Sequence, residues 1–182
     1  MKGERNMELF DASFTRRSYR GMYKPDPVPR EDLKKILEAV LAAPSGCNKQ
    51  TTSAIAVDDP ALMKKMAELI AKKPNFASAP ACICILTEKK IAYGDRTYYI
   101  QDYSAAIQNA LLAIAALGYE SCWVEGNITG DDRIGAAMAK ELGVPENLEL
   151  ICYLPVGKAA EEGGRATKLP FEERAWFNGY RK

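Results

Sequence analysis

The sequence predicts a single domain, residues 1–182, that mixes α-helices with β-strands. The chain has 182 residues, of which 47% are apolar and 27% charged. A domain of this size buries roughly 70% of its unfolded surface and needs no disulfide or metal staple. Helical patterns alternate with short runs of strand-forming residues, and no repeat, low-complexity segment or linker divides them. One run, 81–86, is apolar throughout, which is typical of a buried strand.

The first sixty residues predict two helices, an extended segment and a strand. A short helix is expected around 8–14. Three prolines keep residues 23–29 extended, because each proline fixes its own φ and restrains the residue before it. Apolar residues then recur at helical spacing over 33–41, and Pro44 ends that helix. Residues 51–57 predict a strand.

Capping residues and helical spacing define the elements that follow. Asp59 before Pro60 predicts a helix N-terminus, since aspartate caps free backbone N–H groups and proline suits the first helical position. Residues 99–117 predict a long helix that Gly118 ends. Its many alanines would let a second helix approach closely, as at a dimer interface. Further strands are expected at 81–86, 121–125 and 148–156, and a further helix at 131–142.

The C-terminal segment, residues 160–182, is rich in aromatic side chains and follows the last predicted strand. It carries Phe171, Trp176, Phe177 and Tyr180. A domain this small has little room to bury them, so we expect the segment to form an arm that packs on a partner subunit. A surface helix on its own subunit is the alternative.

Composition excludes several classes of chemistry. Twenty-five Lys and Arg balance 24 Asp and Glu, so no bulk charge favours a nucleic acid or an anionic membrane, and any polyanion site must be local. Histidine is absent, which removes Ser-His-Asp and Cys-His triads, imidazole bases and most catalytic zinc sites. Chemistry must therefore use carboxylates, thiols, phenols, backbone amides or a cofactor.

Cysteine usage favours a cytoplasmic protein. The five cysteines are an odd number and lack the dense framework of small secreted domains. With no histidine nearby, Cys82 and Cys84 are interpreted as small buried residues on one face of a strand, with no metal site. The N-terminus has no signal-peptide pattern, and no apolar stretch is long enough to cross a bilayer.

The first candidate site is the cluster Arg-Arg-Ser-Tyr-Arg at 16–20. Guanidinium groups offer forked donors that match phosphate oxygens, and Ser18 adds a neutral donor. The cluster therefore predicts a site for a phosphate dianion, which Arg165 and Lys168 would reach from the far end of the chain. A solvated basic turn or a weak RNA-binding patch is the alternative.

The second candidate is the loop Ala-Pro-Ser-Gly-Cys-Asn-Lys-Gln at 43–50. Proline and glycine force the chain out of the helix, and Asn48 and Gln50 present paired donors and acceptors. Such a loop suits the edge of a planar heterocycle, or it is an ordinary helix-terminating loop. No histidine is available to activate Cys47, so we do not expect this thiol to be a nucleophile.

The third candidate is Cys-Trp-Val-Glu-Gly-Asn at 122–127. A strand ending in Glu125-Gly126 exposes backbone N–H groups, and glycine lets a ligand ring approach closely. A plain strand-to-turn junction is the alternative. Neither the G-x-G-x-x-G dinucleotide fingerprint nor a P-loop is present in the sequence.

In order and spacing these motifs resemble the FMN-dependent nitroreductase family, over about residues 10 to 175. The matching elements are 16–20, 43–50, Ala79-Pro80-Ala81 entering a strand, 108–118, 123–126, and Lys168-Leu-Pro-Phe-Glu-Glu. The resemblance implies an α+β fold with a central, mostly antiparallel sheet flanked by helices. It also implies an obligate homodimer that exchanges its C-terminal extensions and holds two FMN molecules at the interface.

The resemblance implies a role for each site residue, with no side chain acting as a catalytic group of its own. Arg16, Arg17 and Ser18 would hold the FMN phosphate, with Arg165 and Lys168 reaching it from the tail. Arg20 would lie near the N1/O2 edge of the ring, where positive charge favours the anionic reduced flavin. Glu125 and Gly126, after Trp123 and Val124, would place N–H groups near N5 and O4, where hydride arrives and leaves. The other subunit would contribute Pro44, Ser45, Gly46, Asn48 and Gln50, and Asn75 or Asp102 are further candidate ring contacts.

The activity implied by the resemblance is ping-pong hydride transfer from NAD(P)H to a small electron-poor acceptor such as a nitroaromatic or a quinone. Cofactor chemistry would also explain how the protein works without histidine. The chain is shorter than the better-known members, and 94–99 would be the remnant of the insertion that roofs their flavin. Reductive dehalogenation, flavin fragmentation and a non-catalytic flavin carrier or redox sensor are alternatives. Neither a nucleic acid nor a membrane is expected as a partner.

Overall fold

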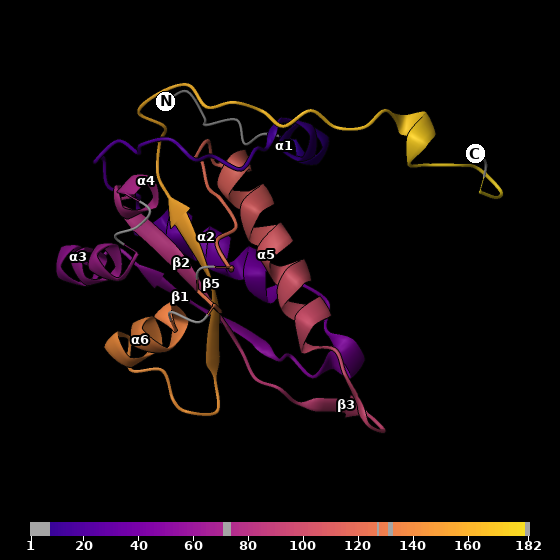
Figure 1. Ribbon diagram of the computed structural model, residues 1–182, viewed down its shortest axis with the longest axis horizontal. Coiled ribbons are helices and arrows are strands. Elements are labelled where there is room, and N and C mark those ends of the chain that lie inside the picture. Colours follow the sequence, from indigo (N-terminus) through magenta and orange to yellow (C-terminus); the bar gives the residue numbers. More distant parts are fainter. Residues whose placement is uncertain (1–7, 71–73, 127, 131–132, 181–182) are drawn as a thin grey trace.

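A three-stranded antiparallel sheet lies at the centre of the chain (Figure 1). The structure is a computed structural model that describes residues 8–70, 74–126, 128–130 and 133–180. Strands β1 (Thr52–Val57), β2 (Ala81–Thr87) and β5 (Glu149–Val156) pair in the order β1-β2-β5. The central strand β2 is buried along its whole length, as its continuous apolar run predicts.

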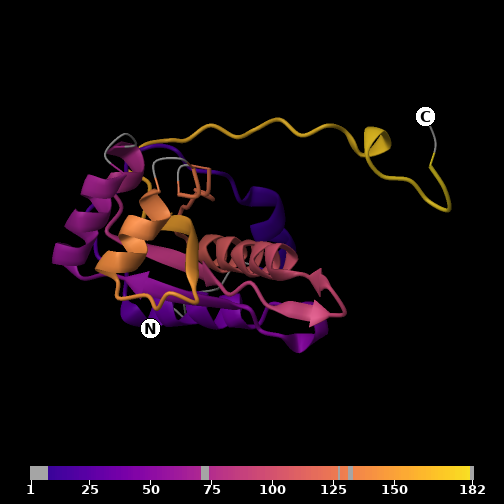
Figure 2. The same cartoon turned by 60° about the horizontal axis from the view of Figure 1, so that its bottom comes forward.

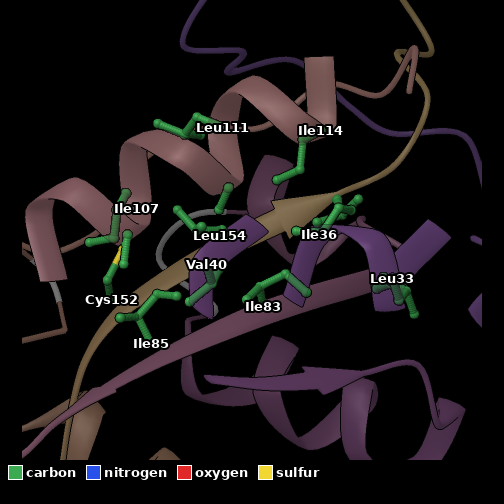
Figure 3. Close-up of a cluster of buried hydrophobic side chains, with 14 of the residues drawn as sticks. Leu33, Ile36, Val40, Ile83, Ile85, Ile107, Leu111, Ile114, Cys152 and Leu154 are labelled. Atoms are coloured by element: carbon green, nitrogen blue, oxygen red, sulfur yellow. The ribbon is translucent and has the colours of Figure 1, made fainter. Parts of the chain in front are cut away.

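Helices cover both faces of this sheet. Helices α2 (Arg30–Leu41) and α5 (Tyr99–Ala116) pack on one face, where Ile83 and Ile85 of β2 meet them (Figure 3). Helices α3 (Pro60–Leu69), α4 (Pro74–Ala77) and α6 (Ile134–Glu141) lie on the other side with Cys82 and Cys84. Because side chains alternate along a strand, the two cysteines share a face, and their sulfurs lie 3.9 Å apart. The observed layers confirm the expected α+β fold with an antiparallel sheet.

Local signals place most elements correctly. The Asp59 carboxylate accepts the N–H groups of Ala61 and Leu62 at 3.0 and 2.9 Å, so the expected cap of α3 is present. Helix α1 (Leu9–Thr15) and strands β1 and β5 lie within one residue of their expected bounds. Among the described helices, none is both long enough and apolar enough to cross a membrane. No cluster of three or more metal-ligating side chains occurs in the same part of the chain.

One expected strand is absent, and one hairpin was not expected. Residues 121–125 form no strand; only Val124 pairs with Tyr153, because the neighbouring backbone and side chains bond to the N-terminal segment and to α5. Strands β3 (Ile91–Tyr93) and β4 (Arg96–Thr97) form a hairpin that overlaps the segment 94–99, the proposed remnant of an insertion. Its strands are too short and exposed to leave a periodic pattern. Of the helix expected at 131–142, α6 covers Ile134–Glu141, and 131–132 lie outside the described residues.

The C-terminal arm, of which the structure describes residues 160–180, leaves the body of the protein after β5 (Figures 1 and 2). It contains one short 3₁₀ turn, η2 (Phe171–Glu173), so the expected alternative of a surface helix is absent from these residues. Its rings contact one another: Phe171 lies 6.1 Å from Phe177, and Trp176 lies 4.3 Å from Tyr180, between centroids. The side chains of Phe177 and Tyr180 are 78% and 70% exposed, which a soluble chain rarely tolerates in a cluster.

Candidate functional site

The basic segment 16–20 follows α1 and runs along residues 120–122. The N–H of Tyr19 donates to the carbonyl of Ser121 at 2.9 Å, and the buried Tyr19 hydroxyl donates to the carbonyl of Met22 at 2.6 Å. These bonds fix the segment to the body of the protein. Arg17 lies on the same side as Tyr19, with its guanidinium carbon 5.5 Å from the ring centroid. The segment is therefore fixed to the body of the protein and is not a loose basic turn; we call residues 16–20 the ledge.

A groove of about 880 Å³ opens between this ledge and the start of the C-terminal arm. The sequence predicted that Arg165 and Lys168 would join the cluster from the far end of the chain, and the structure does bring them to one groove. Two carboxylates, Glu161 and Glu162, also line it, and Glu161 accepts the N–H of Met22 at 3.0 Å. The cations that line the groove outnumber these carboxylates: Arg16, Arg17, Arg20, Arg165 and Lys168.

Arg16 and Arg17 differ sharply in their bonding. Arg17 pairs with Glu120, Nη2 to Oε1 at 2.8 Å, and also donates to the carbonyl of Gly163. It therefore fastens the beginning of the arm to the ledge. The Nε of Arg16 is buried and has no hydrogen-bond partner among the described residues. A buried unpaired donor of a charged group is costly, so this atom is where an anion fits.

The thiol of Cys122 lies beneath the ledge. Burial raises the pKa of this thiol, while the charge of Arg20, the Ser18 hydroxyl and the charge of Arg16 act in the opposite direction. Arg16, Ser18 and Arg20, which the resemblance assigns to FMN, therefore all act on one buried thiol.

Glu125 is held by two side-chain donors at the end of the same segment. The Tyr103 hydroxyl donates to Oε1 at 3.1 Å, and the Trp123 indole N–H donates to Oε2 at 2.7 Å. Burial, followed by the negative charge of Glu125, raises the pKa of Tyr103 to about 12, so the phenol stays protonated and donates. Neither Glu125 nor Gly126 uses its backbone N–H in a hydrogen bond within the described chain. The structure therefore presents this peptide as a pair of available donors.

The loop 44–50 is fastened at a different place, to the first turn of α5. Asp102 is buried; its Oδ1 accepts the N–H of Gly46 at 2.8 Å, and its Oδ2 accepts the hydroxyl of Thr51 at 2.7 Å. A Cβ on Gly46 would lie 2.5 Å from the Tyr98 ring, so only glycine fits there.

The backbone of this loop is strained. Three residues other than glycine have positive φ: Cys47 at 50°, Asn48 at 53° and Gln50 at 47°. Such conformations persist only when surrounding contacts impose them, and they concentrate at functional sites. The Asp102 carboxylate and a bond from the N–H of Gln50 to the Ser45 hydroxyl, 3.0 Å long, supply those contacts.

The basic groove and the loop lie at opposite ends of α5 (Figure 1). Arg16 and Arg17 pack near Ile114 and Ala115, whereas the loop is tied to Asp102. The thirteen helical steps from Asp102 to Ala115 separate the two by about 20 Å. Within one chain, the structure therefore brings 16–20 together with Arg165 and Lys168 and leaves the loop apart. Residues 121–126 run from Ser121, which is bonded to Tyr19, to Glu125, which is bonded to Tyr103 near the other end of α5.

Sequence reasoning missed the residues that position the site. It assigned no role at the site to Tyr103 or to Glu120. Asp102 and Asn75, the two further candidate ring contacts, both bond within the chain. Asp102 holds the loop, and the Asn75 amide donates to the carbonyl of Arg20 at 2.5 Å. A lone carboxylate in the apolar first half of α5 was the available signal for Asp102.

Comparison with known proteins identifies the family. The sequence profile of the nitroreductase family matches residues 14–75 and 71–158. The chain belongs to the nitroreductase family. This nitroreductase-family chain is 34% identical, over 155 residues, to a protein of Archaeoglobus fulgidus that carries a provisional name as an NADH dehydrogenase/NAD(P)H nitroreductase. That match covers 85% of this chain and 87% of the relative.

Solved structures share the same fold. An FMN-dependent nitroreductase of Clostridium difficile R20291 superposes with a TM-score of 0.76 at 30% identity, covering 94% of this chain and 99% of the other. A BluB-like flavoprotein of Clostridium difficile 630 superposes with a TM-score of 0.81 at 26% identity, covering 95% and 100%. The family and fold expected from the motifs are thereby confirmed.

Proposed function

We propose that this protein is an FMN-dependent oxidoreductase that uses NAD(P)H to reduce small electrophilic acceptors, such as nitroaromatics or quinones, by ping-pong hydride transfer. The observation that carries the proposal is the basic groove. It joins cations from both ends of the chain around Arg16, whose buried Nε lacks a partner among the described residues. Relatives named for FMN and for NAD(P)H support the same cofactor and donor.

The residues that line the groove fit the FMN phosphate in charge. Arg16, Ser18, Arg165 and Lys168 would hold its phosphate dianion, and guanidinium groups suit phosphate better than point charges do. Arg17 would contribute mainly by holding the arm against the ledge, because Glu120 and Gly163 already engage its donors. Arg20, which is exposed on the ledge, would supply positive charge toward the ring.

The ring-binding part of the proposal uses the other end of the same segment. When bound, FMN supplies the N5 position that accepts and returns hydride. The free N–H groups of Glu125 and Gly126 would donate to the ring where electron density rises on reduction, and Val124 holds them in place by pairing with Tyr153. No acid or base among the side chains is required.

We further propose a homodimer in which the loop 44–50 of one subunit completes the site of the other. The loop is tied to Asp102, whereas Arg16 of the basic groove packs near Ala115, about 20 Å farther along α5 of the same chain. The exposed rings of the arm, together with Phe10 and Phe14 on α1, 72% and 78% exposed, would be covered by the partner. We expect the whole chain to act as one domain in the cytoplasm, with the arm as its exchanged part.

A visible spectrum tests the cofactor, and reduction tests the activity. The purified protein mixed with FMN should retain a yellow chromophore through gel filtration, and NADH or NADPH should bleach it under anaerobic conditions. Re-oxidation by a quinone or a nitroaromatic should then restore the colour. A protein that stays colourless with excess FMN would end the proposal. A yellow protein that neither nucleotide bleaches would favour a flavin carrier or redox sensor.

A second candidate keeps FMN and changes the reaction. One close structural neighbour is described as a flavoprotein and not as a nitroreductase, which supports flavin chemistry without fixing the acceptor. Reductive dehalogenation or fragmentation of the flavin are the alternatives on this fold. Product analysis under air and without oxygen separates them: recycled FMN favours the main proposal, and loss of FMN with turnover favours fragmentation.

A further inference from the structure

Glu125 is the most heavily bonded residue near the proposed ring site, and its bonds come from three directions. Its carboxylate accepts Tyr103 of α5 and Trp123 of its own segment, at 3.1 and 2.7 Å. Its carbonyl accepts the N–H groups of Ile128 and Thr129, at 2.7 and 2.9 Å. The preceding residue is paired with β5. The only backbone group of Glu125 that stays free within the described chain is its N–H.

We propose that Tyr103 and Trp123 are positioning residues that set the reduction potential of the flavin by clamping the Glu125 carboxylate. This inference rests on the proposed function, because it concerns the same flavin site. Neither side chain has to touch the ring; both act through Glu125. The clamp orients the Glu125–Gly126 peptide so that its N–H groups face the ligand.

The clamp also controls charge beside the ring. A carboxylate close to a flavin opposes the gain of negative charge on reduction, and two donors that share its charge weaken that opposition. Tyr103 is only 7% exposed as a whole residue, and its bond to Glu125 is partly buried. Removing either donor should leave the carboxylate less compensated and the peptide less well aligned. Both effects lower the affinity for the reduced cofactor relative to the oxidised one.

Substitutions that remove one hydrogen-bond donor at a time test this inference. Tyr103→Phe removes the hydroxyl and keeps the ring in the core, and Trp123→Phe removes the indole N–H while keeping an aromatic side chain. Tyr119→Phe is the matched control, because its hydroxyl also donates to a carboxylate, Asp32 Oδ2 at 2.9 Å, away from Glu125. The readouts are the affinity for oxidised FMN and the midpoint potential of the bound FMN, with thermal unfolding of the FMN-free protein alongside.

The expected result is a selective change in potential. Tyr103→Phe and Trp123→Phe should each reduce the preference for reduced over oxidised FMN by about tenfold, a fall of ~30 mV in midpoint potential for a two-electron couple. Tyr119→Phe should leave the potential unchanged. Glu125→Gln should shift the potential in the opposite direction, since it removes the negative charge.

Two results would overturn the inference. Midpoint potentials equal to the wild type in Tyr103→Phe and Trp123→Phe, with only a loss of thermal stability, would make both residues purely structural. A fall in Glu125→Gln would contradict the role of its charge. Failure of the proposed function looks different, because the wild-type protein would then bind no FMN and no potential would exist to measure. If Trp123→Phe does not fold, Tyr103→Phe and Glu125→Gln still decide the matter.

Discussion

The two ends of α5 carry two differently built parts of the proposed site. At its N-terminal end, the buried Asp102 satisfies both of its oxygens and holds a strained loop. At its C-terminal end, the basic groove is wide and exposed, and the Nε of Arg16 lacks a partner in the described part of the chain. The polar groups at the N-terminal end are paired within the chain, whereas Arg16 at the C-terminal end has a donor left over for an anion. Substitutions should therefore affect stability at one end and binding at the other.

Asp102→Ala should give the largest effect, and the effect should be on stability. It leaves the N–H of Gly46 and the hydroxyl of Thr51 without their acceptor in a buried site, at a cost of roughly 2–4 kcal/mol. Chemical denaturation of the FMN-free protein measures this. Asp102→Asn keeps an acceptor and should lose less. Equal stability of Asp102→Ala and wild type would show that the loop is held by other contacts.

Arg16→Ala should weaken FMN binding and leave the stability of the fold nearly unchanged. The loss of a charge-assisted phosphate contact, about 1.5–3 kcal/mol, should weaken FMN binding tenfold or more, while unfolding shifts by at most about 0.5 kcal/mol. Fluorescence quenching of FMN measures the affinity. Arg30→Ala removes an exposed arginine that pairs with Asp58 far from the groove and serves as the control. Unchanged retention of FMN by Arg16→Ala would refute the phosphate assignment.

The double substitution Phe171→Ser and Phe177→Ser should weaken the dimer at least tenfold without unfolding the subunit, because these rings are exposed in the single chain. Sedimentation equilibrium measures the dimer, and Leu41→Ser, at a residue that is 66% exposed on α2, is the control. A wild-type protein that sediments as a monomer would contradict the shared site.

Three tyrosines should ionise at a higher pH in the folded protein than in the unfolded chain. Burial raises the pKa of Tyr23 and Tyr153, and burial with the charge of Glu125 raises that of Tyr103 from 10.0 to about 12. These tyrosines therefore stabilise the fold fully below pH ~10, and the Tyr103 contribution is lost as the pH rises through about 12. Ultraviolet titration of phenolate should detect one fewer late-ionising tyrosine in Tyr103→Phe; an unchanged titration curve would contradict the shift.

Cys47→Ser should give the smallest effect. The thiol is exposed, and the chain contains no histidine that would activate it. Turnover of the FMN-loaded protein should match the wild type within experimental error. Complete loss of turnover would instead assign the thiol a role in the chemistry.

The sequence predicted what local patterns determine and missed what long-range contacts determine. The cap at Asp59, the long helix α5 and the buried strand β2 follow from periodicity and capping, and all three are present. The order of motifs predicted the family. It also predicted that Arg165 would lie near the basic segment, and both line one groove. The pairing of Arg17 with Glu120 spans 103 residues and left no local pattern.

The strand expected at 121–125 failed for the same reason. Its three central residues are apolar, as in a strand, but Ser121 accepts a backbone bond from Tyr19 and the Glu125 side chain bonds to α5. Those partners come from distant parts of the sequence. The roles of the site residues at the flavin remain predictions, because they depend on a ligand and on a second subunit.

The most direct test of the central claim compares FMN with riboflavin, which lacks the phosphate. Titrating the wild-type protein with each should give at least tenfold tighter binding of FMN, and raising the salt concentration should narrow the difference. In Arg16→Ala the preference should shrink while riboflavin binding stays the same. Equal affinity of the wild-type protein for the two flavins would contradict the claim that the basic groove binds the phosphate.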